Sequence, residues 1–273
     1  IGGSTATGGG DTSVNLSYAT GNVKSNNANV GGLIGTNMTS GNALASKSTV
    51  TNSYATGSVS VVDGILASSS QSGWGGLIGN NTSINSTLGD TSVSNSYAWG
   101  NVSAVGGNLG GLIGNNQSTG KSTVTNSYAT GAVSSSGAGV VGGLIGQNLS
   151  SLPSDSATSG NVAVSSSYAT GNVSGTTTLG GLIGSNTIGG ANGIANVSYS
   201  YASGNVSGTL VNVGGLIGKN EVGAAGGSAT ISNSYSSNPN AAITVQGSSN
   251  VGGLVGYSYA NASNANVSIS DTY

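Results

Sequence analysis

The side chains able to do acid–base chemistry are few and scattered in this 273-residue sequence. The carboxylates are those of Asp11, Asp63, Asp90, Asp155, Glu221 and Asp271. There is no His, Cys or Arg, so a nucleophilic triad would lack its base and a zinc site its usual ligands. Glycoside cleavage needs two carboxylates held close together, and no such pair recurs here at a fixed spacing. We therefore expect no catalytic residue, no cofactor and no metal, and predict that the chain is not an enzyme.

The positive charges are equally sparse. Lys24, Lys47, Lys121 and Lys219 stand singly, and the formal net charge is −2. Binding of nucleic acid requires a basic patch that neutralises phosphates, so nucleic acid is not an expected partner. No window holds the roughly 18 consecutive apolar residues of a membrane-spanning helix, so this sequence predicts no membrane span.

Two tryptophans, Trp74 and Trp99, are candidates for contacts with sugars. An exposed aromatic ring offers a flat apolar face that a sugar ring can cover. Trp74 follows a segment, 57–73, that departs from the repeat length described below, and Trp99 stands where other repeats have Thr. Ordinary drift within a repeat explains both positions as well. We treat both side chains as candidate surface contacts, with cell-surface or matrix glycans as the partners.

The elements that would position these side chains come from a repeat that fills the sequence. One block is G-G-L-I-G, usually followed by one residue and Asn; it occurs at 31–35, 75–79, 110–114, 142–146, 180–184 and 214–218, and as G-G-L-V-G at 252–256. The second block reads V-x-N-S-Y-A-T-G-N-V-S in its fullest form. Its tyrosines are Tyr18, Tyr54, Tyr97, Tyr128, Tyr168, Tyr201, Tyr235 and Tyr273. A repeat of this length is typical of a solenoid.

The period within the second block indicates strands. Val50, Asn52 and Tyr54 alternate with small residues, and Gly and Asn then mark turns. Stacked copies would place Val on Val and Tyr on Tyr. The two blocks divide each 31–44-residue repeat into near-equal halves, so we predict an all-β parallel β-solenoid with about two coils per repeat. Fifteen half-repeats at a strand spacing of about 4.8 Å would make a rod of roughly 70 Å.

The whole of 1–273 is predicted to be one continuous array. Both ends fall inside the pattern, so we expect the sequence to be part of a longer chain. Segments 57–73, 149–163 and 236–250 depart from the repeat length. Insertions in a solenoid are tolerated at corners, so these segments are expected to be corner loops.

The apolar pair of G-G-L-I-G has two interpretations, because adjacent strand residues point to opposite faces. A bend permitted by the glycines would bury both Leu and Ile. A regular strand would expose a stripe that docks neighbouring rods side by side. The candidate stripe residues are Ile34, Ile78, Ile113, Ile145, Ile183 and Ile217, with Val255 at the last copy.

The asparagines raise two further expectations. Asn52, Asn95, Asn126 and Asn233 share the predicted face of Val50 and Tyr54, so we expect them to form an internal amide ladder. Asn-x-Ser/Thr sequons, the acceptors of N-glycosylation, occur for example at Asn37, Asn101, Asn148, Asn172 and Asn205. We favour the simpler interpretation that these sequons are turn and strand residues of the repeat.

The alternation of G-G-L-I-G with N-S-Y-A-T-G-N-V-S resembles the GLUG-motif repeat family of large secreted bacterial adhesins and related surface proteins. The resemblance covers nearly the whole chain. It implies a right-handed β-helix that serves as a surface-exposed stalk or passenger region, extracellular or at the cell surface, and it brings no catalytic residues. The chain departs from the pattern at Trp99, at Tyr257 after Gly256, and at Ser237-Asn238-Pro239.

The expected function is that of a structural or adhesive extracellular segment, a rigid stalk or fibre that projects or spaces a binding module. Neighbouring rods are expected partners by lateral or end-to-end association, and a self-assembling filament subunit is one alternative. Another alternative is an ice-binding face, since regular Thr rows can order water. The candidate row of Thr20, Thr56, Thr130 and Thr170 is interrupted by Trp99, Ser203 and Ser237.

Overall fold

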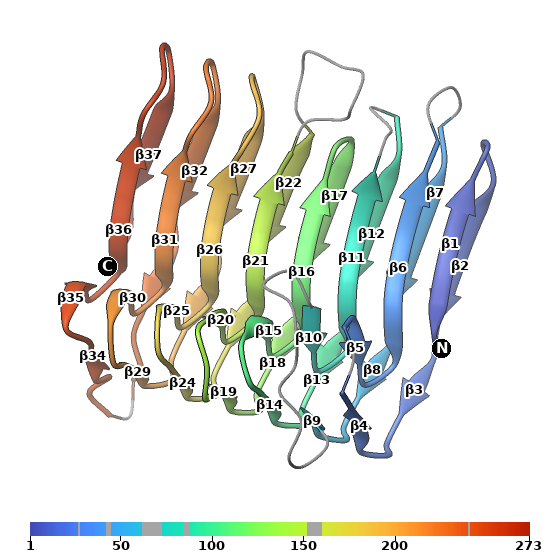
Figure 1. The fold of residues 1–273 in the computed structure, drawn as a ribbon, viewed down its shortest axis with the longest axis horizontal. Helices are drawn as coiled ribbons and strands as arrows, with labels where there is room; N and C mark the ends of the chain where they lie inside the picture. The colour runs from blue at the N-terminus through green and yellow to red at the C-terminus, as the bar shows by residue number, and fades with distance from the viewer. Residues whose placement is uncertain (27, 42–44, 62–72, 85–87, 152–159, 240) are drawn as a thin grey trace.

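The computed structural model describes all residues except 27, 42–44, 62–72, 85–87, 152–159 and 240. The described residues contain strands, turns and bends but no helix. Strands of successive coils pair in parallel and form five sheets that run along a rod, with β1 near one end and β37 near the other (Figure 1). The all-β parallel β-solenoid predicted from the repeat is therefore confirmed.

We call the five sheets A to E. Within each coil, the chain passes through sheets B, C, D, E and A in that order. Sheet A comprises β1 (Gly3–Thr7), β6 (Ile34–Ser40), β11 (Ile78–Ile84), β16 (Ile113–Ser118), β21 (Ile145–Ser150), β26 (Ile183–Ile188), β31 (Ile217–Val222) and β36 (Val255–Ala260). Sheet B comprises β2 (Asp11–Asn15), β7 (Lys47–Thr51), β12 (Asp90–Ser94), β17 (Lys121–Thr125), β22 (Asn161–Ser165), β27 (Ile194–Ser198), β32 (Ser228–Ser232) and β37 (Asn266–Ser270).

The other three sheets have shorter strands. Sheet C comprises β3 (Tyr18–Ala19), β8 (Tyr54–Ala55), β13 (Tyr97–Ala98), β18 (Tyr128–Ala129), β23 (Tyr168–Ala169), β28 (Tyr201–Ala202) and β33 (Tyr235–Ser236). Sheet D comprises β4 (Val23–Ser25), β9 (Val59–Val61), β14 (Val102–Ala104), β19 (Val133–Ser135), β24 (Val173–Gly175), β29 (Val206–Gly208) and β34 (Val245–Gln246). Sheet E comprises β5 (Val30–Gly31), β10 (Gly73–Gly75), β15 (Gly107–Gly110), β20 (Gly139–Gly142), β25 (Thr178–Gly180), β30 (Val211–Gly214) and β35 (Ser249–Gly252).

Each repeat forms one coil, and the predicted two coils per repeat are wrong. Tyr18 pairs with Tyr54, and Tyr54 with Tyr97, so equivalent residues meet after one whole repeat. A coil of half a repeat would have stacked the tyrosine block on the G-G-L-I-G block and lost the pairing of like side chains. The seven steps between the eight strands of sheet B, at about 4.8 Å each, span about 34 Å, not the predicted 70 Å.

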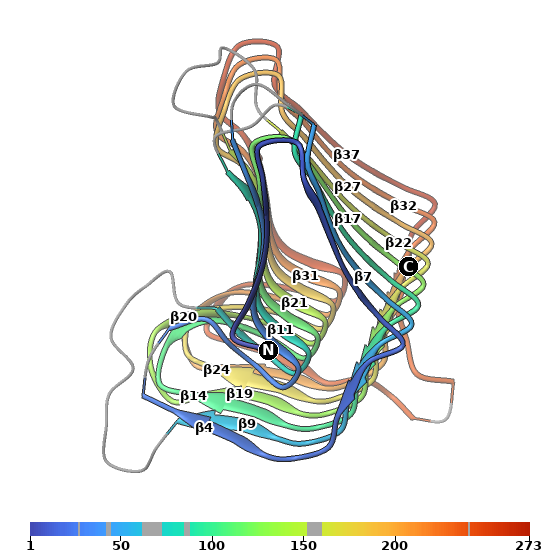
Figure 2. The same ribbon diagram turned by 90° about the vertical axis from the view of Figure 1, so that its right-hand side faces the viewer.

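The cross-section has a narrow arm and a wider lobe. Sheets A and B face each other along the arm, and the strands of C, D and E close the lobe (Figure 2). One apolar cluster fills the space between A, B and C, and a second, containing Trp74 and Leu109, lies between D and E. A third, containing Val162 and Ile188, lies between A and B towards the tip of the arm.

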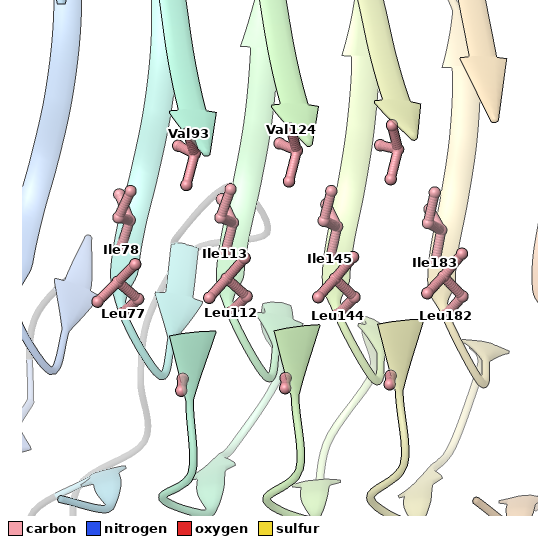
Figure 3. Packing of buried hydrophobic residues seen from close by; sticks show 14 of the residues in the cluster. Leu77, Ile78, Val93, Leu112, Ile113, Val124, Leu144, Ile145, Leu182 and Ile183 are labelled. Carbon is pink, nitrogen blue, oxygen red and sulfur yellow. The ribbon is translucent and has the colours of Figure 1, made fainter. Parts of the chain in front are cut away.

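The G-G-L-I-G block forms the bend between sheets E and A. The backbone N–H groups of Leu33 and Ile34 both donate to the carbonyl of Leu77, each at 3.0 Å. Two successive N–H groups therefore share one acceptor at a bend of the backbone, which breaks the alternation of side chains. Both side chains consequently point into the same core. Figure 3 shows the Leu and Ile of successive coils repeating at the same place in this core.

The corner between sheets B and C explains the N-S-Y sequence. Asn52, Asn95, Asn126 and Asn233 have φ of 48–51°, a left-handed conformation that Asn tolerates better than most residues. This conformation turns their side chains out to solvent, so the predicted internal ladder at these asparagines is wrong. The Ser that follows each Asn is buried and accepts a backbone N–H from the neighbouring coil, as Ser96 does from Ser53 at 3.2 Å.

The internal amide ladder lies instead at the Asn that follows G-G-L-I-G-x, in sheet A. Its members, fully buried at 0 % exposure, are Asn37, Asn81, Asn116, Asn148, Asn186 and Asn220. In the first five members the amide Nδ2 donates to the Oδ1 of the next member, at 2.7–2.8 Å. The row ends at Asn220, since the next coil carries Ser258 at this position. These bonds satisfy buried polar groups along the rod axis, where an unpaired amide would be costly.

Candidate functional site

The predicted isoleucine stripe does not reach the surface. Ile34, Ile78, Ile113, Ile145, Ile183 and Ile217 are each 0 % exposed, because the bend between sheets E and A turns them into the core. The interpretation of G-G-L-I-G as a bend is confirmed, and these residues are removed as candidate surface contacts. Lateral docking through an isoleucine face is therefore excluded.

Trp74 is also buried. Its side chain is 0 % exposed and occupies the inward row of sheet E, between Val30 and Leu109 of the neighbouring coils. The large ring fills a place that Val or Leu takes in other coils, so it packs the core between sheets D and E. Trp74 therefore cannot contact a sugar at the surface.

A row of stacked tyrosines forms the outer surface of sheet C. The tyrosine ladder consists of Tyr18, Tyr54, Tyr97, Tyr128, Tyr168, Tyr201, Tyr235 and Tyr273. Neighbouring ring centroids are 4.8–5.3 Å apart, with interplanar angles of 10° or less. Because neighbouring rings cover each other's faces, the inner rings present mainly edges and hydroxyl groups to solvent.

Trp99 is the one predicted aromatic contact that the structure places at the surface. It is 50 % exposed, and its ring centroid lies 5.1 Å from that of Tyr97. Its position follows Ala98 of sheet C, where the neighbouring coils carry Thr56 and Thr130. The indole therefore stands in the predicted threonine row and interrupts it, which leaves this row without the regular surface expected of an ice-binding face.

The tyrosine ladder should make the rod sensitive to alkaline pH. Burial, and then the neighbouring phenol groups, raise the pKa of Tyr97, Tyr168 and Tyr201 above the ordinary value of 10.0. A phenol whose pKa is higher in the folded state than in the unfolded state contributes to stability. This contribution is fully present below pH about 10 and is lost as the pH rises through the pKa of the folded state. We expect the thermal midpoint to fall as pH rises above about 10. Thermal unfolding followed by circular dichroism checks this, and a midpoint that rises or stays constant would contradict it.

A groove lies beside the ladder at the coil whose turn departs from the repeat. It is lined by Thr170, Tyr201, Ser203, Tyr235, Ser237, Asn238, Pro239 and Tyr273, and its volume is about 500 Å³. The Asn238 amide Nδ2 donates to the carbonyl of Ser203 at 3.3 Å, which ties the turn to the previous coil. Aromatic edges, hydroxyls and one amide thus surround a hollow that is open to solvent.

The charged side chains are not randomly placed along the rod. Sheet B brings Asp11, Lys47, Asp90 and Lys121 into one row in alternating sign, and the backbone N–H of Lys47 donates to Asp11 Oδ1 at 2.9 Å. In sheet A, Lys219 Nζ lies 2.7 Å from Glu221 Oε2. Asp63 and Asp155 lie outside the described residues. Within the described part, no group of three or more metal-ligating side chains occurs.

The sequons divide between the core and the surface. Asn37 and Asn148 belong to the buried amide ladder, so their amides are inaccessible to glycosylation in the folded rod. Asn101, Asn172 and Asn205 are exposed, and each Oδ1 accepts a backbone N–H from the next coil at 2.8–2.9 Å. A turn or strand role within the repeat therefore accounts for all five. No helix long and apolar enough to span a membrane is present in the residues that the structure describes.

Comparison with known proteins yields one family match. Residues 26–60 match the model described as the GLUG motif. The matched segment includes the bend at Gly31–Gly35 and the corner at Asn52–Tyr54, so it spans about one coil. Neither the curated proteins nor the solved structures gave a match. The chain is thus a parallel β-solenoid that carries the GLUG motif at residues 26–60, which supports a GLUG repeat family.

Proposed function

We propose that this chain is a rigid stalk segment of an extracellular or cell-surface adhesin, which holds a binding module at a fixed distance from its anchor. The observation that carries the proposal is the uniform coil. Each repeat has the same five strands, and each coil pairs with its neighbours over all five sheets. Length therefore grows in proportion to repeat number, while the cross-section stays constant.

The composition suits this role. Axial hydrogen bonds, the amide ladder and the tyrosine ladder all run along the rod, so a pulling force along the axis loads many parallel contacts. Charged residues are 4 % of the chain. Uncharged Ser, Thr and Asn can stack on their own kind at strand spacing, whereas rows of like charge would repel. The repeat can thus be extended without accumulating repulsion.

Direct contact with cell-surface or matrix glycans is the second candidate function. Trp99 favours it, because this large residue is 50 % exposed next to the tyrosine ladder, in a row that otherwise carries Thr and Ser. The groove beside Tyr201 and Pro239 adds aromatic edges and hydrogen-bonding groups. In this case the stalk itself would contribute to adhesion.

Shortening the array tests the stalk. A known binding module is displayed on a cell through this chain, through a variant lacking residues 129–168, and through a variant lacking residues 129–201. Both deletions join Tyr128 to an Ala of sheet C, and so remove one or two whole coils in register. We expect binding to a ligand behind a surface barrier to fall stepwise with each deletion. A flexible Gly/Ser linker of equal residue number is the control.

The outcomes separate the two candidates. Equal binding for all arrays and for the linker would overturn the stalk. Capture of glycan-coated beads by the array without the module, lost in Trp99→Ala, would make glycan binding the function.

A further inference from the structure

We infer that the tyrosine ladder is a site of oxidative cross-linking, at which hydrogen peroxide and a peroxidase join consecutive coils through dityrosine. The first observation is proximity: seven pairs of phenol rings in neighbouring coils have centroids 4.8–5.3 Å apart. The second is access. Tyr18 and Tyr273 are 64 % and 74 % exposed, and the inner tyrosines are partly exposed along the outer face of sheet C.

The rest of the chain offers few competing targets for an oxidant. There is no Cys and no His, and only one Met and two Trp accompany the 11 tyrosines. Trp74 is buried, and Trp99 stacks on Tyr97 of the ladder itself. Among the described residues, none accepts a hydrogen bond from, or donates one to, a hydroxyl group of the tyrosine ladder. The ladder O–H groups are therefore solvated. Oxidation should therefore fall mainly on tyrosine, and eight of the 11 tyrosines form the ladder.

The reaction balances with hydrogen peroxide as the oxidant and a haem peroxidase as the catalyst. Two phenols each lose one electron and one proton from the O–H, giving two phenoxyl radicals. Their unpaired spins combine at the ring carbons ortho to oxygen, and one C–C bond forms. The hydrogens on these carbons then transfer to the oxygens and restore both phenols. The two electrons and two protons reduce one hydrogen peroxide to two waters, so each cross-link costs the protein two hydrogen atoms.

Stacking favours coupling within one molecule. Groups held in contact react as if at a very high local concentration, and only neighbouring coils bring two ladder phenols together. The rings must rotate out of their parallel stack for the C–C bond to form, which their partly exposed position at the surface allows. Each product would join two consecutive coils covalently and prevent the rod from opening between them. This inference does not depend on the adhesive role.

Peptide mapping gives a specific test. The purified chain is treated with horseradish peroxidase and hydrogen peroxide at low protein concentration, denatured and digested with trypsin. Cleavage after Lys24, Lys47, Lys121 and Lys219 places three neighbouring pairs on different peptides. We expect Tyr18–Tyr54 to join 1–24 to 48–121, Tyr97–Tyr128 to join 48–121 to 122–219, and Tyr201–Tyr235 to join 122–219 to 220–273. Each joined pair should weigh two hydrogens less than the sum of its peptides.

Two sets of substitutions provide the controls. Replacing Tyr54, Tyr128, Tyr201 and Tyr235 with Phe keeps the rings but leaves no two neighbouring tyrosines in the ladder, so all three joined pairs should disappear. Replacing the tyrosines outside the ladder, Tyr199, Tyr257 and Tyr259, should leave them unchanged. If the fourfold variant does not fold, Tyr97→Phe alone should remove the second joined pair and retain the other two.

Other patterns would overturn the inference. Joined peptides from distant coils, such as 1–24 with 220–273, would show that stacking does not direct the reaction. The inference would also be overturned if the joined peptides persisted in a folded fourfold variant, or if their yield grew in proportion to protein concentration. Failure to detect any joined peptide would overturn it as well.

Discussion

Asn116→Ala should lower the free energy of unfolding by about 4 kcal/mol, since it leaves several buried polar groups unpaired. Asn116 Oδ1 accepts hydrogen bonds from Asn81 Nδ2 at 2.7 Å and from Ser122 Oγ at 2.6 Å. Its Nδ2 donates to Asn148 Oδ1 at 2.7 Å. The substitution removes all three bonds and interrupts the amide ladder in the middle of the rod. Urea denaturation followed by circular dichroism measures the loss.

Asn161→Ala is the matched control. Asn161 is exposed on the outer face of sheet B in β22, so the same substitution should change stability by no more than about 0.5 kcal/mol. Equal losses for the two variants would show that the buried amides do not stabilise the rod, and the ladder would then be a packing feature only.

Gly111→Ala should also lower the free energy of unfolding strongly, by about 3 kcal/mol or more, because of steric overlap. A Cβ at Gly111 would lie 2.1 Å from the carbonyl oxygen of Gly143 and 2.8 Å from Ala129 Cβ. The first contact is with backbone of the neighbouring coil, which can move only if the coils separate. The midpoint of urea denaturation should fall accordingly.

Gly253→Ala tests whether this loss comes from stacking. Gly253 holds the same position in its G-G-L-V-G block, but a Cβ there meets no atom within 4 Å. Neither glycine has a positive φ, so conformational strain is the same for both. We expect Gly253→Ala to leave the midpoint nearly unchanged. A similar fall in both variants would contradict the close approach of coils at Gly111.

The axial pairing of like residues could be predicted from the repeat. Equivalent tyrosines recur in every copy, and only a solenoid brings copies into contact one after another. The number of coils per repeat was predicted wrongly, because two blocks of similar length look like two similar turns. The pairing of Tyr18 with Tyr54 shows why one coil is required. Only a whole repeat later does the chain offer another Tyr to stack on.

Side-chain direction was harder to predict, because it depends on single bends. Strict alternation from Val50 places Asn52 inside, but its left-handed φ of 50° turns it outward. The shared carbonyl of Leu77 similarly turns both Leu33 and Ile34 inward. The Asn that follows G-G-L-I-G in most copies was the available signal for the buried amide ladder. Alternation from the Ile did not place this Asn inside, because Asn37 lies three residues after Ile34 and strict alternation would point the two side chains to opposite faces.

The surface site was predicted only in part. Trp99 stands on the outer face, whereas Trp74 fills the inward row of sheet E. Nothing in the composition distinguishes these two tryptophans. Their flanking glycines did differ, since Trp74 directly precedes G-G-L-I-G and so belongs to the strand that enters the buried bend. The groove beside Pro239 depends on a turn whose sequence departs from the repeat. Such a departure shows that the turn differs from the others, but the sequence alone does not predict the conformation of that turn.

One distance tests the central claim that each repeat is one coil. The chain has no Cys, so spin labels can be attached at Ser13→Cys and Ser268→Cys, which occupy equivalent positions in β2 and β37. Electron–electron double resonance should give a separation of about 34 Å, shortened by about 5 Å when 129–168 is removed and by about 10 Å when 129–201 is removed. A separation near 70 Å, with steps of about 10 Å per repeat, would require two coils per repeat and would contradict the structure.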